Sequence, residues 1–246
     1  MLRLIRGAIW TLYGACALAA FGLLFVVAAA LVLAVPRLEW RRGLVRLLAR
    51  VALGIFGLRV TTLGLENLPE GSCVVVANHS SYLDGFALKT ALPPRFSFVI
   101  KREAASMPVV GVVLRRIGSE FVDRHNEGGR HRDARRVMRH AEAGHSLVFF
   151  PEGTFDGQAG LKRFHIGAFV AATRGGMPIV PVVIRGARHL LPSGSHIPRP
   201  GTITVEILAP LATADVDVSV ETLRDDARRR ILERLDEPDL TSTSSR

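Results

Sequence analysis

The chain has 246 residues, of which 48% are hydrophobic and 22% are charged. This length supplies one substantial core plus a membrane element but hardly two independent enzymes, so we expect one domain. The formal net charge of +10 favours anionic partners, which include phospholipid head groups, phosphorylated small molecules, an acidic carrier protein and nucleic acid. The two cysteines, Cys16 and Cys73, lie in dissimilar apolar surroundings and suggest neither a disulfide framework nor a metal knuckle.

The N-terminal stretch is long and apolar. No charged residue lies between Arg6 and Arg37, a run of about 30 positions, whereas roughly 20 are enough to span a bilayer. The pattern predicts a membrane anchor. A cleaved signal peptide is the alternative, which the length disfavours because its apolar core usually has about 7–15 residues. A shallow re-entrant hairpin is also open.

A basic segment follows the apolar run. Its arginines alternate with aliphatic residues, which favours a basic amphipathic helix in the head-group layer, although a solvated helix docked on the domain fits equally well. The positive charge on this flank predicts that the rest of the chain is cytoplasmic. We therefore expect an anchor and interfacial segment over 1–57, one domain over 58–240 and a disordered tail over 241–246. The arginines are Arg37, Arg41, Arg42, Arg46 and Arg50.

From Leu58 onward, short apolar runs alternate with helical patterns, which is typical of an α/β domain. Several runs are apolar on both faces and predict the centre of a mixed, largely parallel sheet flanked by helices. Positions 202–207 alternate instead, so we predict an edge strand there. Helices are predicted over 132–143, 164–173 and 220–235. The predicted strands are 58–63, 73–77, 96–100, 120–122, 147–150, 179–184 and 202–208.

His79 and Asp84 belong to the segment N-H-S-S-Y-L-D, which leaves a predicted strand and enters a helical pattern. Their spacing puts them on opposite faces of a strand and about 140° apart around a helix, so only a strand-loop-helix turn lets them meet. At the helix N-terminus Asp84 can accept from one ring nitrogen of His79 and leave the other as a base. Such a pair suits proton removal from an attacking alcohol. The alternative is an N-cap aspartate beside a hydrogen-bonded loop histidine.

The segment F-P-E-G-T, residues 150–154, also follows an apolar run. Gly153 permits close backbone approach, so the turn can present N–H groups to a phosphate while Thr154 donates its hydroxyl. A plain surface turn is the alternative. The chain has no G-x-S-x-G elbow, Walker A loop, dinucleotide glycine fingerprint or H-E-x-x-H helix. We expect no metal site.

The ordered pair of N-H-S-S-Y-L-D and F-P-E-G-T resembles the glycerolipid acyltransferase family, typified by bacterial 1-acylglycerol-3-phosphate acyltransferases. The resemblance spans roughly 58–210 and includes the blocks 118–124 and 179–182. It implies that His79 is the general base and Asp84 its orienting partner. It further implies that substrate is bound by Arg124 at the acceptor phosphate, by Glu152, Gly153 and Thr154 at the acceptor site, by Pro181 at the pocket wall and, in a weaker block, by Lys101.

The resemblance implies a fatty acyl transfer from acyl-CoA or acyl-carrier protein to the hydroxyl of a lysophosphatidate-like acceptor in phospholipid biosynthesis. It implies a site on the cytoplasmic side of the inner membrane, no cofactor beyond the donor and no nucleic-acid partner. The alternatives are another lyso-lipid acceptor such as a lyso-ornithine lipid, a membrane-bound thioesterase or lipid hydrolase, and a non-catalytic anion-binding module. Phe155 departs from the family, which usually has a cation there. Its presence implies weaker phosphate binding or another head group, with Lys162 and Arg163 as substitutes for the charge.

Overall fold

The computed structural model describes residues 2–123, 127–213 and 218–241, with side chains over 13–123, 131–213 and 218–241. Its seven strands form one sheet in the order β1-β7-β6-β2-β5-β3-β4. The described pairings are parallel, except that β6 runs antiparallel to β7. The predicted mixed, largely parallel α/β fold is confirmed. The strands are β1 (Leu58–Leu63), β2 (Val74–Ala77), β3 (Ser97–Lys101), β4 (Glu120–Val122), β5 (Leu147–Phe149), β6 (Ile179–Arg185) and β7 (Gly201–Ile207).

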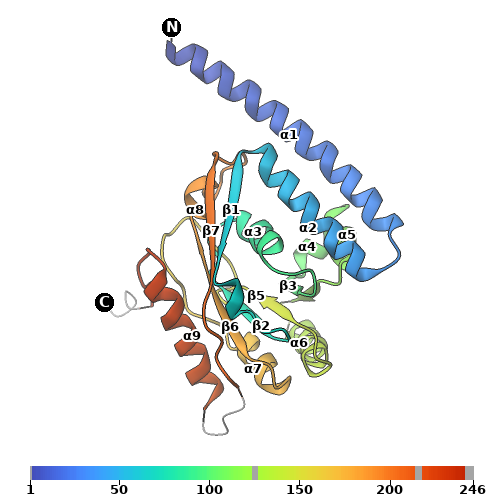
Figure 1. Cartoon of the computed structure of the whole chain (residues 1–246), viewed down its shortest axis with the longest axis vertical. Helices are drawn as coiled ribbons and strands as arrows, with labels where there is room; N and C mark the ends of the chain where they lie inside the picture. The colour runs from blue at the N-terminus through green and yellow to red at the C-terminus, as the bar shows by residue number, and fades with distance from the viewer. Residues whose placement is uncertain (1, 124–126, 214–217, 242–246) are drawn as a thin grey trace.

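Helices cover both faces of the sheet (Figure 1). One hydrophobic cluster joins the sheet to α2 and α3, and a second joins its other face to α6, α7 and α9. The three predicted helices are present as α6, α7 and α9, with shifted ends. The helices are α1 (Leu2–Ala34), α2 (Leu38–Ile55), α3 (Leu83–Ala91), α4 (Glu103–Ser106), α5 (Val110–Arg116), α6 (Glu127–Glu142), α7 (Gly167–Arg174), α8 (Ala187–Leu190) and α9 (Val220–Arg234), with a 3-10 turn η1 (Leu65–Asn67).

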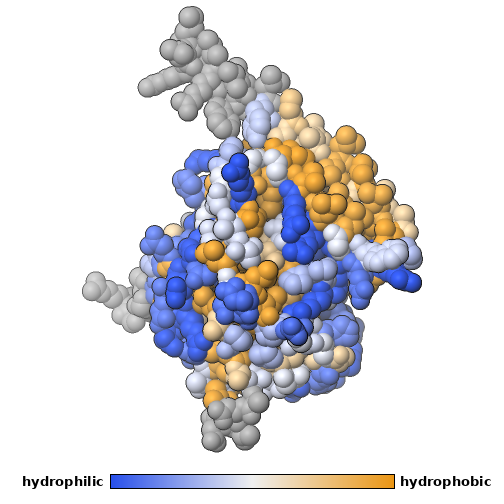
Figure 2. All heavy atoms as spheres, viewed as in Figure 1, coloured by the Kyte–Doolittle hydropathy of each residue, from blue (hydrophilic) through white to orange (hydrophobic). Residues whose placement is uncertain are grey.

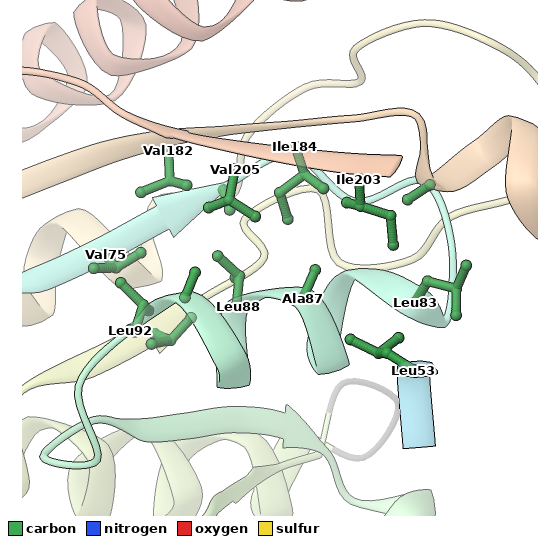
Figure 3. Packing of buried hydrophobic residues seen from close by; sticks show 14 of the residues in the cluster. Leu53, Val75, Leu83, Ala87, Leu88, Leu92, Val182, Ile184, Ile203 and Val205 are labelled. Carbon is green, nitrogen blue, oxygen red and sulfur yellow. The ribbon is translucent and has the colours of Figure 1, made fainter. Parts of the chain in front are cut away.

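Strand β2 shows why its residues are apolar on both sides. Val75 and Ala77 belong to the cluster on the α3 face, while Val74 and Val76 belong to the opposite cluster. Figure 3 shows the α3 side of this packing, where Leu88 and other α3 residues lie against the aliphatic side chains of the sheet. Full burial of each large aliphatic side chain stabilises the fold by about 1.5–3 kcal/mol. The start of α3 is therefore held firmly at one edge of the sheet.

The prediction of an edge strand at 202–207 is wrong, because β7 lies between β1 and β6. Ile203, Val205 and Ile207 are buried, whereas the intervening Thr204 and Glu206 are only partly covered. The alternation therefore reports a partly wet face of the sheet and not a place at its edge. Glu206 pairs on that face with Arg185 at 2.7 Å. Among the described strands, β1 and β4 occupy the edges.

Helix α1 is the most apolar element. Among the described residues, one helical stretch, Tyr13–Ala34, is long and apolar enough to cross a bilayer. It packs on α2 and α5 and leaves a broad hydrophobic surface, visible at the upper right of Figure 2. The exposed apolar residues include Leu23, Val26 and Val27 on α1 and Trp40, Leu47 and Val51 on α2. This surface suits association with a membrane.

Helix α2 directs its arginines at the domain. Buried Arg42 donates from Nε to the carbonyl oxygen of Ile117 and from Nη1 to that of Arg95, both at 2.9 Å. Arg46 donates to the carbonyl oxygen of Thr90 at 3.1 Å, near the negative end of the α3 dipole. Burial lowers the pKa of Arg42. Arg42 and Arg46 therefore dock α2 on the domain, which was the second interpretation of this segment. Contact of α2 with lipid head groups stays a prediction.

Candidate active site

Two loops meet at the edge of the sheet where β2 and β5, which are parallel neighbours, end. The first loop, residues 78–82, joins β2 to α3, and the second loop, residues 150–166, joins β5 to α7. Ligands of open α/β sheets bind outside the carboxyl ends of the strands. The two sequence motifs therefore share the edge at which such folds place their sites.

His79 and Asp84 are brought together by the first loop. The carboxylate of Asp84 is fully buried, and its Oδ2 lies 2.9 Å from Nδ1 of His79. The same oxygen accepts from the backbone N–H groups of Ser80 at 2.6 Å and Ser81 at 2.8 Å. These bonds fix the bend that the spacing requires. With Nδ1 bound to a carboxylate, Nε2 is the ring nitrogen oriented for proton transfer.

Two further side chains hold the first loop, and neither was predicted. The amide of Asn78 donates to the carbonyl oxygen of Ile184 at 2.9 Å and accepts from the Ile184 N–H at 2.7 Å. Ser81 donates from its hydroxyl to the carbonyl oxygen of Leu191 at 2.9 Å. An amide at the end of an apolar strand was the available signal, because a buried amide needs hydrogen-bond partners.

Glu152 connects the two loops. Its buried carboxylate accepts from the N–H of His79 at 2.6 Å through Oε1 and from the N–H of Lys162 at 2.9 Å through Oε2. Burial raises the pKa of Glu152, although both N–H groups favour the carboxylate. Both oxygens thus bind main-chain groups of this chain. The predicted role of Glu152 at the acceptor stays a prediction, while its two bonds link the second loop to the backbone of His79.

Gly153 and Thr154 follow at the turn. Gly153 has a φ of +84°, which favours glycine, and its N–H donates to the carbonyl oxygen of Phe150 at 3.0 Å. Thr154 is exposed, and its carbonyl oxygen accepts from Nζ of Lys162 at 3.3 Å. Lys162 also pairs with Asp156, which lowers the pKa of that carboxyl group. The ammonium group of Lys162 therefore lies beside Thr154, although the next residue in the chain is Phe155 and not a cation.

Two aromatic rings contact the His79 imidazole, and the sequence did not predict these contacts. The His79 ring stacks on Phe150 with centroids 4.1 Å apart and an interplanar angle of 20°. Phe155 meets the same imidazole edge-on at 4.6 Å. Tyr82 in turn contacts Phe155 at 4.8 Å, at an angle of 84°. The imidazole is held by rings as well as by Asp84.

Residues 236–241, here called the C-terminal strap, hold the second loop from outside. Leu161 donates from its N–H to the carbonyl oxygen of Pro238 at 2.9 Å, and the N–H of Gly160 donates to Glu237 at 2.8 Å. Arg188 pairs with Glu237 at 2.8 Å and donates to the carbonyl oxygen of Asp156 at 3.2 Å. Of the tail predicted at 241–246, Thr241 belongs to this strap, and 242–246 lie outside the described residues.

An apolar cavity of about 350 Å³ lies between α1, α2 and α5. Phe86, in the first turns of α3, lines it and contacts Phe21 of α1 with ring centroids 6.4 Å apart. The cavity therefore reaches the helix that carries Asp84. Its volume falls within the range of about 300–1,000 Å³ that is usual for small-molecule sites.

The remaining predicted residues are placed as follows. Lys101 is the last residue of β3 and shares the carboxyl edge of the sheet with His79. Pro181 is buried within β6, opposite Val76 of β2. Arg124 lies outside the described residues. Among the residues that the structure describes, no group of three or more histidine, cysteine or acidic side chains is arranged to hold a metal ion.

Comparison with known proteins agrees with this geometry. The acyltransferase family model matches residues 59–185. A chloroplastic 1-acyl-sn-glycerol-3-phosphate acyltransferase of Brassica napus is 34% identical over 69% of this chain and 49% of its own length. The human 1-acyl-sn-glycerol-3-phosphate acyltransferase beta is 32% identical over 68% and 63%. A mouse lysophospholipid acyltransferase is 34% identical over 74% and 36%.

The chain spans about half the length of the first curated relatives that it matches. Among solved structures, the 1-acyl-sn-glycerophosphate acyltransferase of Thermotoga maritima superimposes with a TM-score of 0.74 over 99% of this chain and 98% of that one, at 23% identity. This likeness shows a shared fold. The match of the acyltransferase family model over residues 59–185, which include both motifs, shows that the chain belongs to the acyltransferase family.

Proposed function

We propose that the protein transfers a fatty acyl group from a thioester donor, acyl-CoA or acyl-carrier protein, to the hydroxyl of a lysophosphatidate-like acceptor in phospholipid biosynthesis. The observation that carries the proposal is the contact of His79 with buried Asp84 at the end of β2, with Glu152 joining the base to the second loop. The relatives' names, which specify lysophospholipid acceptors, support the same class of reaction.

The proposed chemistry needs one base and no covalent enzyme intermediate. Nε2 of His79 removes the proton of the acceptor hydroxyl while the hydroxyl oxygen attacks the thioester carbonyl. Asp84 keeps the imidazole oriented and stabilises the imidazolium that forms. When the carbon–sulfur bond breaks, the imidazolium returns its proton to the leaving thiolate. The products are the acylated lipid and the free thiol of the donor.

The substrate sites follow from the surroundings of the base. The fatty acyl chain of the donor occupies the apolar cavity between α1, α2 and α5, because burial there removes its apolar surface from water. We propose Arg124 as the bidentate ligand of the acceptor phosphate, the role that the family resemblance gives to this arginine. Lys101 and Lys162 add positive charge, and Thr154 a hydroxyl. In this proposal Glu152 and Gly153 line the acceptor site, and buried Pro181 shapes the acyl or acceptor pocket from within β6.

The proposed location is the cytoplasmic side of the inner membrane. The Tyr13–Ala34 stretch and the exposed apolar side chains of α1 and α2 support membrane contact. Both substrates suit this placement, because the acceptor resides in the bilayer and the anionic donor approaches a chain with a net charge of +10.

A panel of acceptors tests the proposed function. Full-length protein in vesicles is given one radiolabelled acyl-CoA and, separately, lysophosphatidate, lysophosphatidylcholine, a lyso-ornithine lipid or glycerol 3-phosphate. We expect labelled phosphatidate as the main product. Labelled product from another lyso-lipid would keep the reaction class and change the acceptor. Release of free fatty acid alone, at a rate that no acceptor changes, would instead identify a thioesterase.

A further inference from the structure

A base that activates an acceptor hydroxyl can activate water in the same way, so a transferase needs a means of keeping water from His79. Thioester hydrolysis wastes the donor and produces a free fatty acid. Exclusion of water from a site is the usual protection against such side reactions. The surroundings of the imidazole indicate how this chain achieves it.

The imidazole has little contact with solvent. The side chain of His79 is 18% exposed, and its Nδ1 is occupied by Asp84. Phe150 stacks on the ring at 4.1 Å and Phe155 meets it at 4.6 Å. Carbon atoms on these sides offer water no hydrogen bonds, so a water molecule there would lose bonds that it has in bulk. Phe150, the first residue of the second loop, packs against the core cluster, whereas Phe155 lies further along the same loop.

Phe155 lies between the imidazole of His79 and the ring of Tyr82. Its ring contacts His79 on one side and Tyr82 at 4.8 Å on the other. Tyr82 is 69% exposed and comes from the first loop, so its ring lies outermost. The two rings, here called the aromatic cover, bridge both loops. A ring in the core would be explained by stability alone, but this pair extends from the base towards solvent.

We propose that Phe155, supported by Tyr82, determines the choice between acceptor and water by covering the His79 imidazole; this inference rests on the proposed function. In transfer, the acceptor oxygen forms the ester bond, the carbon–sulfur bond breaks and His79 passes the acceptor's proton to the thiolate. In hydrolysis, a water oxygen forms the bond instead, and the products are a fatty acid and the same thiol. A lysophospholipid acceptor can place its apolar part beside the rings and exclude water, which favours transfer.

The test measures both products from one donor. Full-length protein in vesicles receives labelled acyl-CoA with a lysophospholipid, and the ratio of free fatty acid to acylated lipid is determined for wild type and variants. For Phe155→Ala we expect this ratio to rise about tenfold. For Tyr82→Ala, which removes an exposed ring and leaves the loop's own bonds, we expect about threefold. The double variant His79→Ala with Phe155→Ala should form neither product, because the same base serves both reactions.

The matched control is Leu65→Ala, which removes a half-exposed apolar side chain from η1, away from both loops. Its ratio should equal that of wild type. If Phe155→Ala and Tyr82→Ala lower both products in proportion and leave the ratio unchanged, the aromatic cover is overturned while transfer by wild type still supports the proposed function. If wild type itself forms fatty acid and no acylated lipid with any acceptor, the proposed function fails, and the inference fails with it.

Discussion

The first and second loops end neighbouring strands at one edge of the sheet, yet they are stabilised differently. The bonds that orient the His79 ring are local, because Asp84 binds Ser80, Ser81 and His79, all within five positions of itself, while Asn78 and Ser81 anchor the first loop to Ile184 and Leu191. The second loop depends on distant partners, since Glu152 reaches His79 and the C-terminal strap reaches Leu161. The imidazole of His79 is thus oriented by local bonds, whereas the second loop beside it is positioned by contacts with distant parts of the chain.

This difference predicts separate consequences for mutations. Changes in the first loop should impair the chemical step for every acceptor. Changes that release the second loop should impair use of the acceptor more than use of the donor, because the proposed acyl cavity is formed by α1, α2 and α5 instead.

The largest effect is expected for Asp84→Ala. The change removes the orienting partner of His79 and leaves two backbone N–H groups without their acceptor in a buried position. We expect turnover to fall by about 10²–10⁴-fold and the free energy of unfolding to fall by about 2–4 kcal/mol. Steady-state kinetics and denaturant unfolding measure the two effects. A variant with near-normal turnover would show that the carboxylate does not orient the base.

Glu152→Ala tests the link between the loops. The N–H groups of His79 and Lys162 each lose their acceptor, so we expect a loss of about 1–3 kcal/mol of unfolding free energy and about 10–100-fold in turnover. Glu152→Gln is the control, because its amide oxygen can still accept one of the two bonds. The difference between the loops would be refuted if Glu152→Ala impaired turnover as much as Asp84→Ala.

Arg188→Ala tests the C-terminal strap. Arg188 pairs with Glu237 and binds the carbonyl oxygen of Asp156, so its loss frees the second loop on the strap side. If the acceptor loses about 1 kcal/mol of binding free energy, its KM should rise about fivefold. The KM for acyl-CoA should change by less than about twofold. Arg229→Ala, in an exposed ion pair of α9, is the matched control. Equal changes in both KM values would argue against a role confined to the acceptor.

Lys89→Met, at the opposite end of α3 from Asp84, should leave turnover unchanged and alter stability. Burial, followed by the charge of Arg42, lowers the pKa of Lys89 from its ordinary 10.5 to about 8. Its charged form is thus disfavoured by folding, at a cost that is full below about pH 8 and vanishes towards pH 10.5. Phe98, whose ring lies 4.9 Å from the ammonium, offsets part of this cost.

We therefore expect Lys89→Met to raise the free energy of unfolding by about 1–3 kcal/mol at pH 7 and by less at pH 10. Denaturant unfolding at the two pH values measures the change. A stabilisation that is equal at both would exclude ionisation of Lys89 as its cause. A loss of turnover would mean that the far end of α3 also affects the first loop.

The sequence predicts best those features that depend on local contacts. Apolar runs predicted the strands, and the spacing of His79 and Asp84 required the bend that the structure contains. The prediction failed for β7, since alternation reports how wet each face is and not which strands lie beside it. In α2, the periodicity predicted a basic face and an apolar face, but it did not determine that Arg42 and Arg46 point towards the domain.

The second loop could not be derived in this way. Its placement depends on the C-terminal strap, where the carbonyl oxygen of Pro238 accepts from the N–H of Leu161. No local sequence pattern predicts such a contact. Glu152 lay in a recognised motif, yet its bond to the N–H of His79 spans 73 positions. The aromatic cover likewise joins Tyr82 of one loop to Phe155 of the other. These features arise from packing of the complete sheet.

The most direct test of the central claim, that His79 is the base of an acyl transfer, is the turnover of His79→Ala relative to wild type in the same vesicles with a saturating lysophospholipid. Asp84 keeps its bonds to Ser80 and Ser81 in this variant, so its unfolding free energy should stay close to that of wild type. We predict a loss of turnover of at least about 10²-fold. Near-normal acyl transfer by a correctly folded His79→Ala protein would contradict the account.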